Sequence, residues 1–186
     1  MSIAETLVTA REFAEMVDDR RTELVRGRII EMTPPKPKHG KIVSNIARLV
    51  GAFVVDRDLG HWFIEAGVIT ERDPDSVRAP DATFISYARL PRDADDSEYS
   101  PVSPDLAFEV FSASDRWVDV LDKVAEYLRA GTQVVCVVVP ATKTVQLHQA
   151  DSPPITLNEA EMFELPEILP GFRCQVAEFF PRQPKK

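Results

Sequence analysis

The sequence has little cysteine, no long apolar run and no excess of positive charge, and each shortage excludes a class of protein. Only two cysteines occur among 186 residues, which excludes a disulfide-stapled miniature and predicts a reducing compartment, the cytoplasm. The most apolar run, Val134–Val139, is about a third of the roughly 20 residues that a transmembrane helix requires. The first residues also lack the basic segment followed by an apolar stretch that marks a secretory signal.

Charge and composition predict a soluble globular protein. Lysine and arginine number 22 against 30 aspartates and glutamates, so the formal net charge is −8. No broad attraction to nucleic acid or to an anionic membrane is expected, and any nucleic-acid contact must be local. The hydrophobic share of 44% supports a full core. We expect one domain over residues 1–180, followed by a basic tail at 181–186.

The first part of the chain predicts a short helix, a hairpin and a longer helix. Thr9 and Glu12 form a capping box, which starts a helix that runs to about Asp18. β-Branched residues on both sides of an Arg-Gly pair predict a hairpin over 23–32. Apolar residues at helical spacing predict a second helix over about 40–57.

The rest of the chain predicts a mixed sheet. A strand, a helix that stops at Gly131 and a fully buried strand follow one another, which fits a right-handed crossover between parallel strands. The fold class is therefore α/β, with a central mixed β-sheet flanked by helices and an extra N-terminal helix and hairpin. The predicted elements are strands at 61–65, 68–71 and 82–86, a loop at 89–104, a strand at 106–111, a helix at 115–130, and strands at 134–139 and 144–148.

Two carboxylates carry the strongest chemical signal. Glu109 interrupts an otherwise apolar strand, where a carboxylate is unfavourable unless it is paired, hydrogen-bonded or bound to a metal. Asp81 stands at the mouth of the neighbouring strand, so both side chains can hold one hard cation such as Mg²⁺. Taken alone, Asp81 after Pro80 also fits a turn-forming aspartate. Together the two acids favour a metal site.

The order of these motifs resembles a known nuclease family. The motifs that carry the resemblance are, in chain order, Glu23, Arg78-Ala79-Pro80-Asp81, Pro104-Asp105-Leu106-Ala107-Phe108-Glu109, and Lys123 with Tyr127. Their order resembles that of the PD-(D/E)xK nuclease superfamily and, more narrowly, of the Uma-two (Uma2) family of restriction-endonuclease-like proteins. The resemblance covers about residues 20–140. It implies a restriction-endonuclease-like core, a metal-dependent nuclease activity with Mg²⁺ or Mn²⁺, and Asp81 and Glu109 as the metal-binding acids.

The lysine of the superfamily pattern is displaced in this sequence. Phe111 stands two residues after Glu109, where lysine is expected, and the resemblance implies that Lys123 of the following helix replaces it. Helical periodicity places Lys123 at the border of the apolar face, from which it can reach a cleft. A solvated lysine paired with Asp119, four residues earlier, is the alternative.

Further residues are candidates for support and substrate contact. The resemblance implies that Glu23 supports the metal, although Glu31 of the same hairpin is nearly as suitable. His39, with Lys38 and Lys41 at the start of the second helix, could engage a phosphate, or could simply be solvated. Arg78 and Lys36 are weaker candidates for phosphate contacts.

The predicted activity is hydrolysis of DNA phosphodiesters by a metal on Asp81, Glu109 and the Val110 carbonyl, with Lys123 orienting the water or neutralising the pentavalent phosphate. A homodimer would suit double-strand cleavage, but no sequence feature establishes one. The rival prediction is a catalytically inactive protein of the nuclease fold that binds nucleic acid or another protein.

Overall fold

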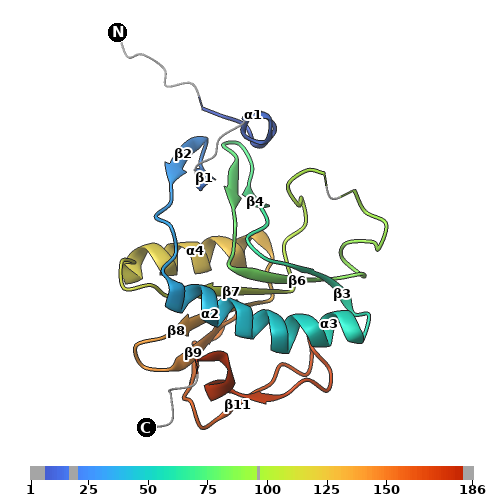
Figure 1. Ribbon diagram of the computed structural model, residues 1–186. Helices are drawn as coiled ribbons and strands as arrows, with labels where there is room; N and C mark the ends of the chain where they lie inside the picture. The colour runs from blue at the N-terminus through green and yellow to red at the C-terminus, as the bar shows by residue number, and fades with distance from the viewer. Residues whose placement is uncertain (1–6, 17–20, 96, 182–186) are drawn as a thin grey trace.

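The computed structural model describes residues 7–16, 21–95 and 97–181 (Figure 1). Its helices are α1 (Ala10–Glu15), α2 (Pro37–Ile46), α3 (Ala52–Asp56) and α4 (Trp117–Ala130), with a π-helical turn η1 (Ala47–Gly51) joining α2 to α3, and a 3-10 helix η2 (Val176–Phe179). Its strands are β1 (Thr22–Val25), β2 (Arg28–Glu31), β3 (Gly60–Phe63), β4 (Val68–Glu71), β5 (Ser76–Arg78), β6 (Ala82–Ser86), β7 (Leu106–Val110), β8 (Val134–Val139), β9 (Thr144–His148), β10 (Ile155–Leu157), β11 (Met162–Phe163) and β12 (Cys174–Gln175).

A mixed six-stranded sheet with the order β10-β9-β8-β7-β6-β3 forms the centre of the fold. Strands β7 and β8 are parallel and α4 connects them, whereas the other neighbours in this sheet run antiparallel. Gly131 ends α4 with φ of 103°, a left-handed conformation that glycine adopts without strain. The predicted strand-helix-strand unit and the α/β fold class are confirmed.

Strand β8 shows how the sheet separates two cores. Its alternate residues Val134, Cys136 and Val138 face the core that contains α2, α3 and the C-terminal segment. The residues between them, Val135, Val137 and Val139, pack against α4. All six are buried, as the run of apolar residues predicted, because helices cover both faces of this strand. Figure 1 shows α2 and α3 on one side of the strands and α4 on the other.

A second, antiparallel sheet with the order β2-β1-β5-β4 stands beside the main one. The predicted hairpin is present, and Arg26 and Gly27 both have positive φ, as its two-residue turn requires. The prediction missed β5 because its three residues, Ser76–Arg78, carry no alternating pattern long enough to recognise. This sheet brings β1 beside the segment that leads into β6.

Helix ends differ from the prediction in three places. The second helix begins at Pro37 rather than Gly40, because proline suits a first helical position, where no N–H partner is needed. Helix α4 begins at Trp117 rather than residue 115, because the Asp115 carboxylate accepts a hydrogen bond from the Ser112 N–H in the preceding turn. Helix α1 has the predicted capping box but ends at Glu15, and the predicted end at residue 18 lies outside the described residues.

The chain after β9 closes the main core. Its buried side chains include Phe163, Leu169, Phe172, Val176 and Phe179, all in the cluster that contains α2. Within the described part of the chain, no helix has the length and apolar character to cross a lipid bilayer.

Candidate active site

Charged residues from both sheets and two helices line a cleft of about 250 Å³. The cleft opens between the β2–α2 segment, the start of β6, the end of β7 and the first half of α4. The ionisable side chains on its wall are Arg21, Glu23, Glu31, His39, Asp81, Glu109, Asp115, Arg116, Asp119 and Lys123.

Strand register places Asp81 opposite Glu109. Strands β6 and β7 are antiparallel, and Ala82 pairs with Phe108, so the next step of the same register sets Asp81 across from Glu109. Cβ atoms of such facing residues lie about 4.5–5.5 Å apart. The Val110 N–H also donates a hydrogen bond of 2.7 Å to Asp81 Oδ2, which fixes this carboxylate against β7. The two acids that the sequence singled out are therefore neighbours.

Glu109 is held in a partly buried position with little compensation for its charge. Tyr127 donates its hydroxyl to Glu109 Oε1 at 2.8 Å, and within the described residues no N–H or O–H donates to Oε2. Burial and the nearby carboxylates of Asp81 and Glu23 outweigh the attraction of Lys123 and raise the pKa of Glu109 to about 7. The cleft thus holds a carboxylate whose ionisation a bound cation would favour.

Asp81 is buried and contacts a histidine. His39 Nε2 lies 3.1 Å from Asp81 Oδ2, and this hydrogen bond raises the pKa of His39 although burial acts in the opposite direction. Oδ1 lies on the other side of the carboxylate, 3.7 Å from Arg21 Nη2. The hydrogen bonds from His39 and from the Val110 N–H are therefore both accepted by Oδ2, and within the described residues none is accepted by Oδ1.

Lys123 reaches the cleft from α4 and pairs with Glu23. Its Nζ donates to Glu23 Oε1 at 2.9 Å, while the alternative partner Asp119 instead lies 3.9 Å from Arg116. Only 15% of the Lys123 side chain is exposed, so the alternative of a solvated lysine paired with Asp119 is wrong. Burial lowers the pKa of Lys123, but Glu109 and Glu23 more than offset it, so the pKa is raised and the ammonium stays charged.

Arg78 and Glu126 form a layer behind Glu23. Arg78 Nη1 donates to Glu23 Oε2 at 2.9 Å, and its Nε and Nη2 donate to Glu126 at 3.0 and 2.6 Å. Thr70 donates its hydroxyl to the same Glu126 carboxylate. Arg78 is thus surrounded by carboxylates, and its geometry favours support of Glu23 over the predicted phosphate contact. Burial opposes ionisation of Glu23, but Lys123 and Arg78 prevail and lower its pKa.

The cleft gathers some of the remaining candidates and leaves others outside. Glu31 lines the cleft at its exposed edge, so Glu23, which contacts Lys123, is the better placed of the two hairpin glutamates. Lys38 points away and donates to the Pro140 carbonyl at 3.3 Å. Lys41 lines a separate groove on α2, and Lys36 is an exposed residue at the cap of that helix.

The model of the Uma2 family, described as "Putative restriction endonuclease", matches residues 10–177. The chain belongs to the Uma2 family. None of the curated proteins matches it.

A solved structure shows the same fold. The crystal structure of a putative nuclease of the DUF820 group from Anabaena variabilis ATCC 29413 superimposes with a TM-score of 0.80 at 20% sequence identity, over 93% of this chain and 97% of the other. The resemblance that the motifs indicated is confirmed, and so is the nuclease-like fold.

The donor set of this Uma2 cleft fits a hard divalent cation. Asp81, directly before β6, and Glu109 on β7 both supply carboxylate oxygens, and oxygen is the ligand that Mg²⁺ prefers. In the described ranges, no group of three or more His, Cys, Asp or Glu side chains is arranged to hold a metal. Mg²⁺ commonly takes only one or two carboxylates and completes its shell with water and substrate phosphate. Two acids are therefore sufficient.

Sequence reasoning missed Glu126 and Arg21. Glu126 is only 5% exposed and lies three residues after Lys123, so both project from one side of α4. An acid beside the apolar face of a helix was the available signal, because such a position needs a buried partner. Arg21 carried no comparable signal.

Proposed function

We propose that this protein is a metal-dependent endonuclease that hydrolyses phosphodiester bonds of DNA, with Asp81 and Glu109 as the ligands of Mg²⁺ or Mn²⁺. The observation that carries the proposal is the pairing of these two acids across β6 and β7 in one cleft with Lys123. Membership of the Uma2 family supports the nuclease class.

Each residue has a role that follows from its contacts. Asp81 is oriented by His39 and the Val110 N–H, which both contact Oδ2, so Oδ1 is the oxygen that would hold the cation. Glu109 is oriented by Tyr127 and presents Oε2. Lys123 supplies a fixed positive charge beside Glu109, where it orients the attacking water or neutralises charge that develops on the phosphate.

The bound cation would polarise the phosphate and lower the pKa of the attacking water. Glu23 acts one step away, because it holds Lys123 at 2.9 Å and is itself held by Arg78. We therefore assign Glu23 to positioning Lys123 rather than to a direct bond with the cation. His39 stands beside Asp81, where it also lies within reach of a phosphate bound in the cleft.

Plasmid cleavage tests the proposal. Purified protein is incubated at low salt with supercoiled and linear DNA in Mg²⁺, Mn²⁺ or chelator, beside the variants Asp81→Asn, Glu109→Gln and Lys123→Met. We expect nicked and linear products that require metal and fall by at least about 100-fold in each variant, as for loss of a main electrostatic contribution. Glu159→Gln, an exposed acid paired with Lys143 outside the cleft, is the matched control.

Folding must be checked in the same samples by thermal melting. Cleavage that persists in folded Asp81→Asn and Glu109→Gln would contradict the assignment of the site. Wild-type protein that cleaves nothing and binds no metal by calorimetry would instead favour the rival prediction of an inactive protein of this fold.

Partners and location follow from the same proposal. DNA is the proposed substrate, and a homodimer stays a prediction that double-strand cleavage would favour. Cys136 and Cys174 are both free and buried, so the prediction of a reducing, cytoplasmic compartment continues to depend on these two thiols.

A further inference from the structure

Positive charge without nearby acid is concentrated along α2. Residues 32–55 contain Lys36, Lys38, Lys41 and Arg48 and not a single Asp or Glu. This segment therefore carries four positive charges, whereas the rest of the chain carries a net −12, which is −8 less those four. A segregated basic helix on an acidic protein is the electrostatic footprint of a local anion-binding surface.

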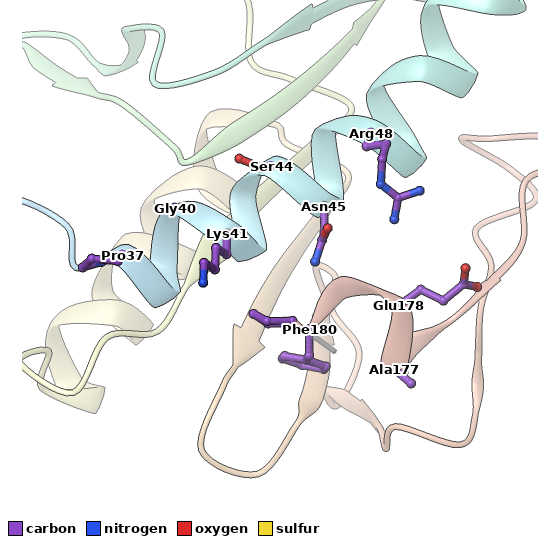
Figure 2. Close-up of a pocket in the computed structure, with 10 residues that line it drawn as sticks. Pro37, Gly40, Lys41, Ser44, Asn45, Arg48, Ala177, Glu178 and Phe180 are labelled. Carbon is purple, nitrogen blue, oxygen red and sulfur yellow. The ribbon is translucent and has the colours of Figure 1, made fainter. Parts of the chain in front are cut away.

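A groove of about 860 Å³ runs along this helix, between α2 and η2. Lys41, Ser44, Asn45 and Arg48 line it at helical spacing. Figure 2 shows Lys41, Asn45 and Arg48 projecting from one side of the helix towards η2. Asn45 Nδ2 donates to the Phe179 carbonyl at 3.2 Å, which holds the two walls of the groove together. The groove is therefore built into the packing of the fold.

The cations of this groove lack the carboxylate partners that some exposed cations have elsewhere. Arg92 pairs with Asp58, and Lys143 pairs with Glu159. Across the described ranges, neither Lys41 nor Arg48 has a carboxylate within 4.0 Å, although Glu178 lines the same groove. The Glu178 carboxylate instead accepts the Gln175 N–H as the cap of η2. Two exposed cations thus face the groove with their charge available to an anion.

The groove and the candidate active site both lie against the first turn of α2. Pro37 and Gly40 line the groove, whereas Pro35 and His39 line the catalytic cleft, so both hollows share the first turn of α2. Seven residues separate Lys41 from Arg48, which is about 10 Å along the helix axis. That span corresponds to about three nucleotide steps of a DNA strand, at about 3.4 Å per step.

We infer that this groove binds the sugar-phosphate backbone of a DNA strand and leads it to the cleft at Asp81. Lys41 and Arg48 neutralise phosphates, and the exposed Ser44 hydroxyl and the Asn45 side chain offer hydrogen bonds to the same oxygens. The choice of DNA and the direction of the strand depend on the proposed nuclease function, whereas the binding surface itself can be tested without cleavage.

Binding at several salt concentrations tests the groove. A fluorescent DNA duplex is titrated with the full chain in chelator, so that cleavage does not interfere. The test variant is Lys41→Gln with Arg48→Gln, and both residues are exposed, so folding should be preserved. The matched control is Arg11→Gln with Lys143→Gln, which removes the same charge from exposed ion pairs outside the groove. Lys41→Arg with Arg48→Lys retains the charge and should bind like the wild type.

The slope of log K, with K the association constant, against log salt concentration is negative. Losing two phosphate contacts should make this slope shallower by about 1.8 and weaken binding roughly 10- to 60-fold at 0.1 M salt. The inference is overturned if the groove variant keeps the wild-type slope, if the control loses as much, or if the wild type does not bind DNA. Tighter binding of the matching RNA duplex would overturn the choice of DNA.

The cleavage assay separates this inference from the proposed function. Metal-dependent cleavage with an unchanged KM in the groove variant would support the proposed nuclease function and contradict DNA binding in the groove. DNA binding that depends on the groove, without cleavage in any metal, would support the groove and contradict the proposed nuclease function.

Discussion

Replacing Glu109 with glutamine should make the protein more stable at neutral pH while it removes the predicted activity. Glutamine has nearly the same shape and can still accept the Tyr127 hydroxyl at its side-chain oxygen. The variant therefore keeps the packing and removes only the ionisable group. An ionised glutamate that lowers the stability of the fold, as we expect of Glu109, has a role other than folding.

The magnitude follows from the pKa of Glu109, which burial and the neighbouring acids raise from 4.5 to about 7. The folded state binds this proton more tightly than the unfolded state. The contribution of protonated Glu109 to the free energy of unfolding is therefore fully present below about pH 4.5 and is lost as pH rises towards 7. That shift in pKa corresponds to about 3 kcal/mol in the free energy of unfolding. The wild type loses this amount as pH rises, and Glu109→Gln does not. The two proteins should be equally stable near pH 4.5 and differ most at pH 8.

Urea unfolding of both proteins in chelator, from pH 4.5 to pH 8, measures this difference directly. Comparison of the two proteins at each pH cancels titrations that they share. A Glu109→Gln variant that is less stable than the wild type at pH 8 would refute the reasoning, because it would mean that ionised Glu109 makes a net favourable structural contact.

Three further outcomes are expected, all measured by urea or thermal unfolding. Glu126→Gln should destabilise the fold by about 3–5 kcal/mol, because it leaves the buried Arg78 guanidinium short of a counter-charge; a loss below about 1 kcal/mol would contradict a buried ion pair. His39→Ala should be more destabilising at pH 6 than at pH 9, because Asp81 raises the pKa of His39 and that stability is lost as pH rises through it; equal losses at both pH values would refute the pairing. Gly131→Ala should destabilise by about 1 kcal/mol from backbone strain at φ of 103°, since no atom lies within 4 Å of the added Cβ.

The parts of the fold that the sequence predicted well are those with a long, regular pattern. The apolar run Val134–Val139 and the amphipathic α4 each repeat over several residues, so their type and neighbours could be inferred. Strand β5, with three residues, and β11 and β12, with two each, are fixed by tertiary pairing rather than by local preference. No local signal of the sequence distinguishes such strands from loop.

The candidate site shows the same division. An acid inside an apolar strand is unusual enough that Glu109 could be identified from the sequence alone, and its register with Asp81 follows from adjacent strands. The partners of Lys123 could not be deduced, because Glu23 lies 100 residues away in another sheet. The sequence grouped Lys38 and Lys41 with His39 because they are close neighbours in the chain. On α2, however, His39 lines the cleft, whereas Lys38 donates to the Pro140 carbonyl and Lys41 lines the groove beside η2.

The charges of the site form two groups: a balanced rear, which is the network of Glu23, Arg78, Lys123 and Glu126, and an unbalanced front at Asp81 and Glu109. At the rear, the carboxylates of Glu23 and Glu126 are matched by the cations of Arg78 and Lys123, each within 2.9 Å of an acid. At the front, Asp81 and Glu109 face each other, and although Lys123, His39 and Arg21 lie nearby, the pKa of Glu109 stays raised. An added cation therefore gains most at the front, because Glu109 can ionise there without disturbing the rear pairs. The rear network then has a purpose that isolated ion pairs lack, since it keeps Lys123 charged and in place whether or not the front is occupied.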